Sequence, residues 1–281
     1  MQQFTKIQEM KDYLRPMQSA GQKIGLVPTM GYLHEGHLSL IRRAVQESDI
    51  AVVSIFVNPI QFGPSEDLAK YPHNLAKDLE LIDKTGAAVV FTPDAVEMYG
   101  DNHLTFVHVE KITDILCGPF RPGHFQGVAT VVNKLFNIVR PDKAYFGQKD
   151  GQQAMVIQKM VRDLNMDVTI ITCPTVREAD GLAMSSRNTY LNVAERSQAP
   201  VLYQVLTAAK DMIQGSITDG VLIKKQIKTM ISSKPLANIE YISLVDASSF
   251  REISQVSGPV MIALAVKFGA TRLIDNIIVE G

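Results

Sequence analysis

The sequence predicts an α/β fold, with a Rossmann-like parallel-sheet domain followed by a smaller C-terminal α+β domain. Two observations lead to this class. Short apolar runs alternate with helical patterns through the first part of the chain, as in a parallel sheet covered by helices. After about residue 180, three strand-like runs follow one another without intervening helices, which indicates antiparallel strands. We therefore expect one domain over residues 1–180 and a second over 181–281.

Composition and charge narrow the class of protein. The chain has 281 residues, 46% of them hydrophobic and 20% charged, which is typical of a soluble globular protein. The net charge of -1 argues against broad binding to nucleic acid or to a membrane. We expect Cys117 and Cys173 to be buried, reduced thiols of a cytoplasmic protein. The N-terminal residues lack the apolar core of a signal peptide, and no apolar run is long enough to span a bilayer.

Hydrophobic periodicity predicts the elements in order. Leu38, Ile41 and Val45 recur at helical spacing, which predicts one buried helix face within residues 36–49. Residues 50–58 are nearly all apolar, which suits a strand buried on both faces. The same criteria predict strands at 23–29, 87–93, 143–147 and 167–176, and helices at 74–86, 125–141 and 151–165.

The second part of the chain has a different pattern. Helices are predicted at 195–215 and 219–231, and strands at 239–247, 260–268 and 271–280. Pro200 lies inside the first of these helices, so it should either kink the helix or mark its true start.

Two histidines open the helix that follows the first long strand, in the sequence HEGH. His34 and His37 are three residues apart and project from the same side of the first turn. A helix N-terminus favours anions, and Gly31 and Gly36 let the backbone approach a ligand closely. The pair indicates a phosphate chain, although no common phosphate-binding loop is present. The alternatives are a capping histidine beside a surface histidine, or zinc, for which no third ligand stands nearby.

A second polar turn, FGQKDGQQ, follows a predicted strand at its C-terminal end, where ligands bind in open parallel sheets. Lys149 could neutralise a phosphate, and Asp150 could hold Mg²⁺ or cap the next helix. Gln152 and Gln153 offer amide groups. The alternative is a solvated polar turn.

Three further segments carry polar groups. Ser185 to Arg187 combine hydroxyls with a guanidinium, which bind phosphate oxygens well, although an ordinary linker is the alternative. Asn58 and Gln61 follow a buried strand and could face the same crevice, but Asn58 also suits turn capping. Arg121 and His124 fit a helix-entry turn as well as they fit a site.

Four motifs occur in one order: PTMGYLHEGH, NPIQF, FGQKDGQQ and VREADGLAMSSRN. Together they resemble the pantothenate synthetase family, whose members join pantoate to β-alanine with ATP, and the resemblance covers essentially the whole chain. HEGH alone would indicate only the wider class of nucleotidyltransferases with a His-x-Gly-His signature. Two positions depart from the family pattern: Gln148 stands where Glu is usual, and His73 where Arg is frequent.

The resemblance implies a cytoplasmic homodimer whose C-terminal domain closes over the active site, with the loop 182–188 as the candidate lid. ATP and Mg²⁺ are implied, the metal being held mainly by the ATP phosphates with Asp150 as a possible ligand. Gln61 and Gln153 are implied to hold pantoate, with Gln61 also near β-alanine. The implied catalytic residues are His34, His37, Lys149 and Arg187. The implied ATP-binding residues are Met30, Gly31, Tyr32, Leu33, His34, Glu35, Gly36, His37, Gly147, Gln148, Lys149, Asp150, Val176, Met184, Ser185, Ser186 and Arg187.

The implied reaction has two steps. The pantoate carboxylate first attacks the α-phosphate of ATP, which gives pantoyl adenylate and pyrophosphate. The amine of β-alanine then displaces AMP. The alternatives are another enzyme of the His-x-Gly-His class, which would transfer AMP or CMP to a different small acceptor, and a non-catalytic nucleotide sensor.

Overall fold

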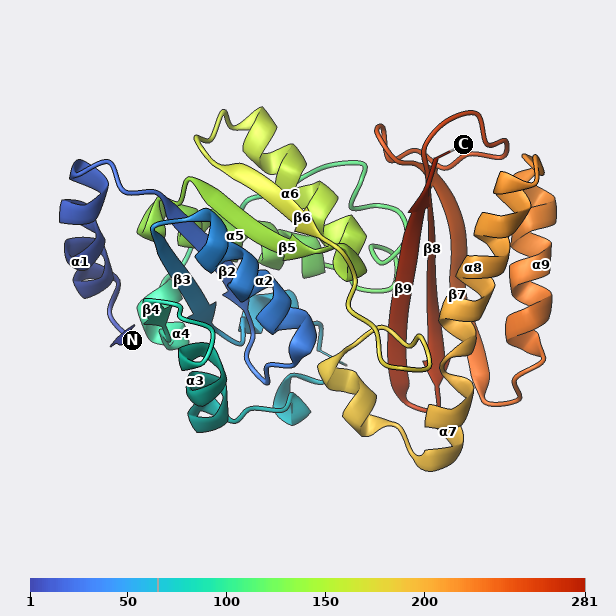
Figure 1. Cartoon of the computed structure of the whole chain (residues 1–281), viewed down its shortest axis with the longest axis horizontal. Helices are drawn as coiled ribbons and strands as arrows, with labels where there is room; N and C mark the ends of the chain where they lie inside the picture. The colour runs from blue at the N-terminus through green and yellow to red at the C-terminus, as the bar shows by residue number, and fades with distance from the viewer. Residues whose placement is uncertain (65, 281) are drawn as a thin grey trace. The chain divides into compact units, whose positions relative to one another are not determined.

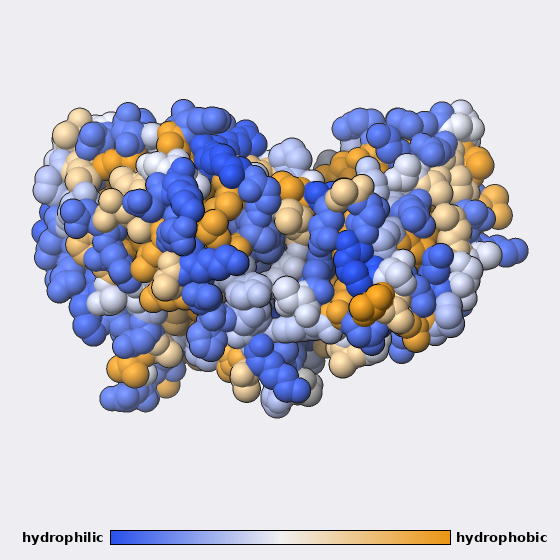
Figure 2. All heavy atoms as spheres, turned by 60° about the horizontal axis from the view of Figure 1, so that its bottom comes forward, coloured by the Kyte–Doolittle hydropathy of each residue, from blue (hydrophilic) through white to orange (hydrophobic). Residues whose placement is uncertain are grey.

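The chain folds into two compact units in a computed structural model that describes residues 1–64 and 66–280. The first unit holds residues 1–114, 118–147 and 153–173, and the second holds 115–117, 148–152 and the chain from Pro174 onward. The domain boundary expected after residue 180 remains a prediction. None of the described helices is long and apolar enough to cross a membrane. Hydrophilic residues cover most of the face shown in Figure 2, and hydrophobic residues occur among them in small groups.

The first unit is built on a six-stranded sheet, and all of its paired strands are parallel (Figure 1). The predicted parallel sheet is therefore confirmed. The strand order is β1–β4–β3–β2–β5–β6. From β2 the chain builds outward to β3 and β4 on one side, and later to β5 and β6 on the other. The strands are β1 (Gln2–Phe4), β2 (Ile24–Thr29), β3 (Ile50–Ile55), β4 (Val89–Phe91), β5 (Lys143–Gly147) and β6 (Thr169–Cys173).

This order creates a switch point between β2 and β5, and the C-terminal side of such a point is where ligands bind in open parallel sheets. Alternate strand residues, such as Val27 of β2 and Val53 of β3, share a buried cluster with Ile41 of the following helix. The opposite residues of the same strands, such as Leu26 and Val52, are also fully buried. Burial on both faces explains why these strands read as continuous apolar runs.

The helices predicted for this unit are confirmed. They are α2 (Glu35–Glu47), α3 (Leu75–Asp83), α5 (His124–Val139) and α6 (Gly151–Asp163). Three elements were not predicted: β1, α1 (Ile7–Ser19) and α4 (Ala95–Tyr99). Helix α1 is polar overall and contains Pro16, but Ile7, Met10 and Leu14 recur at helical spacing, so periodicity was sufficient to predict it. Strand β1 has no buried residue, unlike the equally short β4, whose three residues are all buried, and the five residues of α4 are too few to show a helical period.

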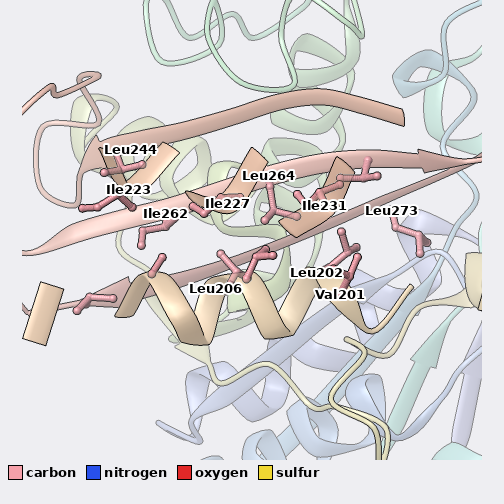
Figure 3. Close-up of a cluster of buried hydrophobic side chains, with 14 of the residues drawn as sticks. Val201, Leu202, Leu206, Ile223, Ile227, Ile231, Leu244, Ile262, Leu264 and Leu273 are labelled. Carbon is pink, nitrogen blue, oxygen red and sulfur yellow. The ribbon is translucent and has the colours of Figure 1, made fainter. Parts of the chain in front are cut away.

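The second unit packs two long helices on an antiparallel sheet, and the predicted antiparallel strands are confirmed. The strand order is β7–β8–β9. Its strands are β7 (Ala237–Asp246), β8 (Val260–Phe268) and β9 (Thr271–Val279), and its helices are α7 (Val193–Gln198), α8 (Val201–Gln214) and α9 (Gly220–Ser232). Pro200 is the N-cap of α8, so it marks a helix start rather than a kink. The core cluster in Figure 3 includes Val201, Leu202, Leu206, Ile223, Ile227, Ile231, Leu244, Ile262, Leu264 and Leu273.

Candidate active site

The two histidines of HEGH lie at the N-terminus of α2, after the loop that leaves β2. His34 is the N-cap residue, and its Nδ1 accepts a hydrogen bond from the Gly36 N–H at 3.1 Å. The Nδ1 of His37 accepts from the His34 N–H at 3.3 Å. The ring centroids lie 4.0 Å apart. The capping alternative is therefore correct for His34, and both rings take part in a reciprocal cap.

This cap determines which ring nitrogen carries the proton. A backbone N–H can only donate, so each Nδ1 must present a lone pair. In the neutral rings the proton therefore lies on Nε2, which makes each Nε2–H a donor. Both side chains are half-buried. Two such donors at the positive end of a helix dipole suit the oxygens of a phosphate chain.

A buried carboxylate from α3 holds the loop before His34. Asp78 is 2% exposed, and its two oxygens accept hydrogen bonds from the N–H groups of Tyr32 at 2.8 Å and Leu33 at 2.7 Å. Gly31 and Tyr32 both have left-handed backbone conformations, with φ of 82° and 51°. This conformation costs energy for tyrosine, so Asp78 stabilises a loop shape that the local sequence would not adopt alone. No sequence pattern distinguished Asp78 from an ordinary acidic residue in a first helical turn.

Asn58 and Gln61 lie after β3, around the 3-10 helix η1 (Pro59–Gln61), and are 1% and 7% exposed. The Nε2 of Gln61 lies 2.9 Å from Met30 Sδ, so the segment after β3 meets the loop after β2. Asn58 Nδ2 donates to Gln61 Oε1 at 3.0 Å and to the Gly127 carbonyl at 3.1 Å. The Asn58 side chain caps no backbone amide of η1, so the interpretation as a turn cap is wrong.

Arg121 and His124 also reach Gln61. His124 Nδ1 donates to the backbone oxygen of Gln61 at 2.8 Å, and Arg121 Nη1 donates to His124 Nε2 at 2.9 Å. Arg121 in turn forms a two-fold ion pair with Glu66, at 2.6 and 2.8 Å. Burial alone would raise the pKa of Glu66, but the hydrogen bond and charge of Arg121 outweigh burial and lower this pKa. His124 is also the first residue of α5, so the helix-entry interpretation holds alongside the contact with Gln61.

In the second unit, Lys149 and Asp150 belong to the 3-10 helix η3 (Gln148–Asp150), which directly follows β5. Lys149 Nζ lies 3.4 Å from Asp150 Oδ1. Asn276 of β9 fixes this turn, because its Nδ2 donates to the backbone oxygens of Gln148 and Lys149, both at 2.9 Å. Its Oδ1 accepts from Gln148 Nε2 at 2.7 Å. The amide donor of Gln148 therefore matches an acceptor on Asn276.

The loop READGLAMSSRN folds as a short hairpin followed by the 3-10 helix η4 (Ser186–Tyr190) of the second unit. The Met184 N–H donates to the Val176 carbonyl at 3.0 Å. Ser185 caps η4 and accepts from the Arg187 N–H at 3.3 Å. This segment is therefore structured rather than a plain linker.

The residues of the expected site divide between the two units. The first unit contains Met30, Gly31, Tyr32, Leu33, His34, Glu35, Gly36, His37, Gln61, Gly147 and Gln153, and the second contains Gln148, Lys149, Asp150, Val176, Met184, Ser185, Ser186 and Arg187. Within the described ranges, no three His, Cys, Asp or Glu side chains gather as ligands for a metal ion.

A switch point in a parallel sheet, followed by a paired-imidazole cap at a helix N-terminus, fits a nucleotide-using enzyme of the His-x-Gly-His class. Comparison with known proteins defines the family. The model of the family described as Pantoate-beta-alanine ligase matches residues 2–278. The chain therefore belongs to the pantoate–β-alanine ligase family, and it is a ligase.

Several known proteins are similar over nearly their whole length. Pantothenate synthetase of Caldicellulosiruptor saccharolyticus is 57% identical over 275 residues, covering 98% of each chain. That of Acetivibrio thermocellus is 55% identical over 274 residues, with the same coverage. The crystal structure of pantothenate synthetase from Thermus thermophilus matches with a TM-score of 0.94 and 41% identity, covering 99% of each chain. A Francisella tularensis pantoate–β-alanine ligase, described as complexed with Beta-gamma ATP and Beta-alanine, matches with a TM-score of 0.81 and 35% identity, covering 99% of this chain and 97% of that one.

Proposed function

We propose that the protein condenses (R)-pantoate with β-alanine to give pantothenate, AMP and pyrophosphate through a pantoyl adenylate. The observation that carries this proposal is the reciprocal cap of His34 and His37, which sets two Nε2–H donors at the N-terminus of α2. Family membership and the ligands named for the Francisella structure support the same substrates.

The first step is adenylation of the acid. A carboxylate oxygen of pantoate attacks the α-phosphorus of ATP, and the bond to the β-phosphate oxygen breaks so that pyrophosphate leaves with the electron pair. Negative charge builds up on the phosphate oxygens, and donors that are already in place stabilise it without reorganising. We assign this role to the imidazoles of His34 and His37, together with Lys149 and Arg187 of the second unit.

The second step forms the amide. The neutral amine of β-alanine attacks the acyl carbon, the bond to AMP breaks, and the nitrogen loses a proton. Neither cysteine is needed as a nucleophile, and both are buried free thiols. Positioning of the two reactants can supply about 7–11 kcal/mol of the barrier reduction. We assign pantoate binding to Gln61 and Gln153, and shielding of the adenylate from water to the loop 182–188.

The ATP-binding residues in this proposal are Met30 to His37, Gly147 to Asp150, Val176 and Met184 to Arg187. Mg²⁺ is commonly held by one or two carboxylates together with substrate phosphates. Asp150, a half-buried carboxylate beside Lys149, fits that donor set, whereas a site formed by protein ligands alone would need more of them. When bound, the ion would neutralise phosphate charge.

We also propose that the protein is a homodimer of the cytoplasm. Support for the dimer comes from residues 102–110, which lie outside any helix or strand and expose Leu104 by 79% and Phe106 by 47%. Exposed apolar side chains that are close in sequence suit an interface. Light scattering after size-exclusion chromatography should give the mass of two chains, and the double change Leu104→Asp and Phe106→Asp should give the mass of one. An unchanged mass in this variant would place the interface elsewhere.

The reaction is tested by isotope exchange. With Mg²⁺, ATP, pantoate and labelled pyrophosphate but no β-alanine, label should return to ATP, because the first step is reversible and needs no amine. Without pantoate the exchange should stop. His37→Ala should slow the exchange strongly, because a donor to the phosphates is lost.

Two outcomes would overturn the proposal. Formation of ADP and phosphate would exclude an adenylate, and exchange without pantoate would exclude pantoate as the acceptor of AMP. Replacing pantoate by free amino acids is the matched control for a tRNA-charging activity, and it should give no exchange.

A further inference from the structure

Three side chains of the first unit form a hydrogen-bond chain that ends at the acid-site residue Gln61. The Tyr99 hydroxyl at the end of α4 lies 2.6 Å from Asn58 Oδ1. Asn58 Nδ2 lies 3.0 Å from Gln61 Oε1. Asn58 and Gln61 are buried and Tyr99 is half-buried, so these bonds are largely shielded from water.

The direction of every bond in this chain follows from one backbone carbonyl. The Gly127 oxygen can only accept, so the Asn58 nitrogen must face it, at 3.1 Å. The Asn58 oxygen then faces Tyr99, whose hydroxyl must donate. The second hydrogen of the Asn58 amide points to Gln61, so the Gln61 oxygen must be the acceptor. An inverted Asn58 amide would place its oxygen against the Gly127 oxygen.

Gln61 therefore has a fixed polarity. Its Oε1 is held by Asn58, and its Nε2 points to the opposite side, 2.9 Å from Met30 Sδ. The backbone of Gln61 is held as well, because His124 donates to its carbonyl at 2.8 Å. Gly127 permits this packing, since a Cβ at that position would lie 2.5 Å from the Ile60 carbonyl oxygen and 2.6 Å from the Gln61 Cα.

We propose that Tyr99 is a positioning residue that acts through Asn58 to hold the Gln61 amide with its nitrogen toward the acid substrate. Gln61 then recognises an oxygen acceptor, a hydroxyl or carboxylate oxygen, and rejects a donor at the same place. This inference rests on the proposed function only in assigning Gln61 to the acid site. Burial raises the pKa of Tyr99, so its hydroxyl keeps the proton that it donates.

The test removes one oxygen atom. Tyr99→Phe should raise the pantoate KM about tenfold, as expected when one buried hydrogen bond is lost, and it should leave the ATP KM within about twofold. Tyr145→Phe is the matched control, because Tyr145 is a buried tyrosine of the same unit that donates to Glu47 at 3.2 Å. The control should leave both KM values unchanged. An unchanged pantoate KM in Tyr99→Phe, or an equal rise in both KM values, would overturn the proposal.

A double-mutant cycle distinguishes positioning from general stabilisation. In the Gln61→Ala background, Tyr99→Phe should have no further effect on the pantoate KM, because the residue on which Tyr99 acts is already gone. Additive effects would mean that Tyr99 acts by another route. Asn58→Asp removes both N–H donors of the amide and should raise the pantoate KM at least as far as Tyr99→Phe does. A smaller effect would contradict the proposed series of hydrogen bonds from Tyr99 through Asn58 to Gln61. If Gln61→Ala alone left the pantoate KM unchanged, the assignment of Gln61 to the pantoate site would fail. The isotope exchange tests the overall reaction separately, so the two failures can be distinguished.

Discussion

Asp78 holds the loop before His34 through two hydrogen bonds, and the loss of stability on their removal can be estimated. Asp78→Ala removes two hydrogen bonds between a carboxylate and backbone N–H groups, at 2.8 and 2.7 Å, and leaves the N–H of the buried Leu33 without that acceptor. A hydrogen bond to a charged group contributes about 1.5–3 kcal/mol. Two bonds give an upper range of about 3–6 kcal/mol, and relaxation of the loop recovers part of it. We expect the free energy of unfolding to fall by about 3 kcal/mol.

The same change should weaken ATP binding. Tyr32 has a φ of 51° while Asp78 holds it, and without Asp78 this residue is free to return to a more stable conformation. The cap of His34 and His37 follows directly, so its imidazoles should lose their fixed positions. We expect the ATP KM in the exchange assay to rise about tenfold or more, because misplaced donors lose much of their interaction.

Asp78→Asn tests whether charge and hydrogen bonding, rather than volume, are responsible. Asparagine keeps the size but offers one acceptor, and its NH₂ group faces the second backbone N–H. Its effect should therefore approach that of Asp78→Ala. Asp219→Asn is the contrasting control, because Asp219 accepts from the N–H groups of Val221 and Leu222 through its Oδ1 alone, at 2.8 and 3.4 Å.

Stability is measured by urea unfolding and ATP affinity by the exchange assay. Asp219→Asn should leave both stability and the ATP KM nearly unchanged, because asparagine keeps the one oxygen that accepts both bonds and caps a helix about as well as aspartate. If Asp78→Ala lowered stability but left the ATP KM unchanged, the hydrogen bonds from Asp78 to the loop would have no role in nucleotide binding. If Asp78→Asn behaved like the unmodified protein, the two hydrogen bonds would not have the strength assigned to them.

Three further predictions concern other parts of the proposed site. Lys149→Ala should leave the fold intact and lower kcat/KM for ATP about a hundredfold, the effect of one strong transition-state contact, and near-normal turnover would exclude this role. Gln148→Glu should lower the melting temperature, because a carboxylate would replace the donor that faces Asn276 Oδ1, and an unchanged melting temperature would contradict that pairing. Arg121 holds the pKa of Glu66 below its ordinary value of 4.5, so this ion pair contributes stability above about pH 4.5 that is lost as the pH falls through the lowered pKa. Glu66→Gln should therefore reduce the fall in melting temperature between about pH 6 and pH 3. If the melting temperature fell as steeply as in the unmodified protein, the ion pair would not have the role assigned to it.

Local sequence patterns were enough to predict most of the longer secondary-structure elements of this protein. Apolar runs and helical spacing predicted the longer strands and helices, because each depends on neighbours within a few residues of the chain. HEGH was likewise predicted to open a helix, since a helix N-terminus is a local feature, and His34 is its cap. Strand β1 escaped detection because its three residues form no buried apolar run, whereas α1 was missed although Ile7, Met10 and Leu14 recur at helical spacing.

Contacts between residues far apart in the sequence decided the strand order and the arrangement of the site. The strand order, and with it the switch point at β2 and β5, follows from how helices cover the sheet rather than from any single segment. Asp78 lies 46 residues from Tyr32, and Asn276 lies 128 residues from Gln148. No local pattern links such partners. The direction of the Gln61 amide depends on Gly127, whose carbonyl accepts from Asn58 and whose lack of a side chain lets two backbones approach. The sequence therefore determined which chemical groups the protein has and roughly where along the elements they lie. Only the tertiary structure decided how those groups are oriented and held, because a hydrogen bond depends on direction as well as on proximity.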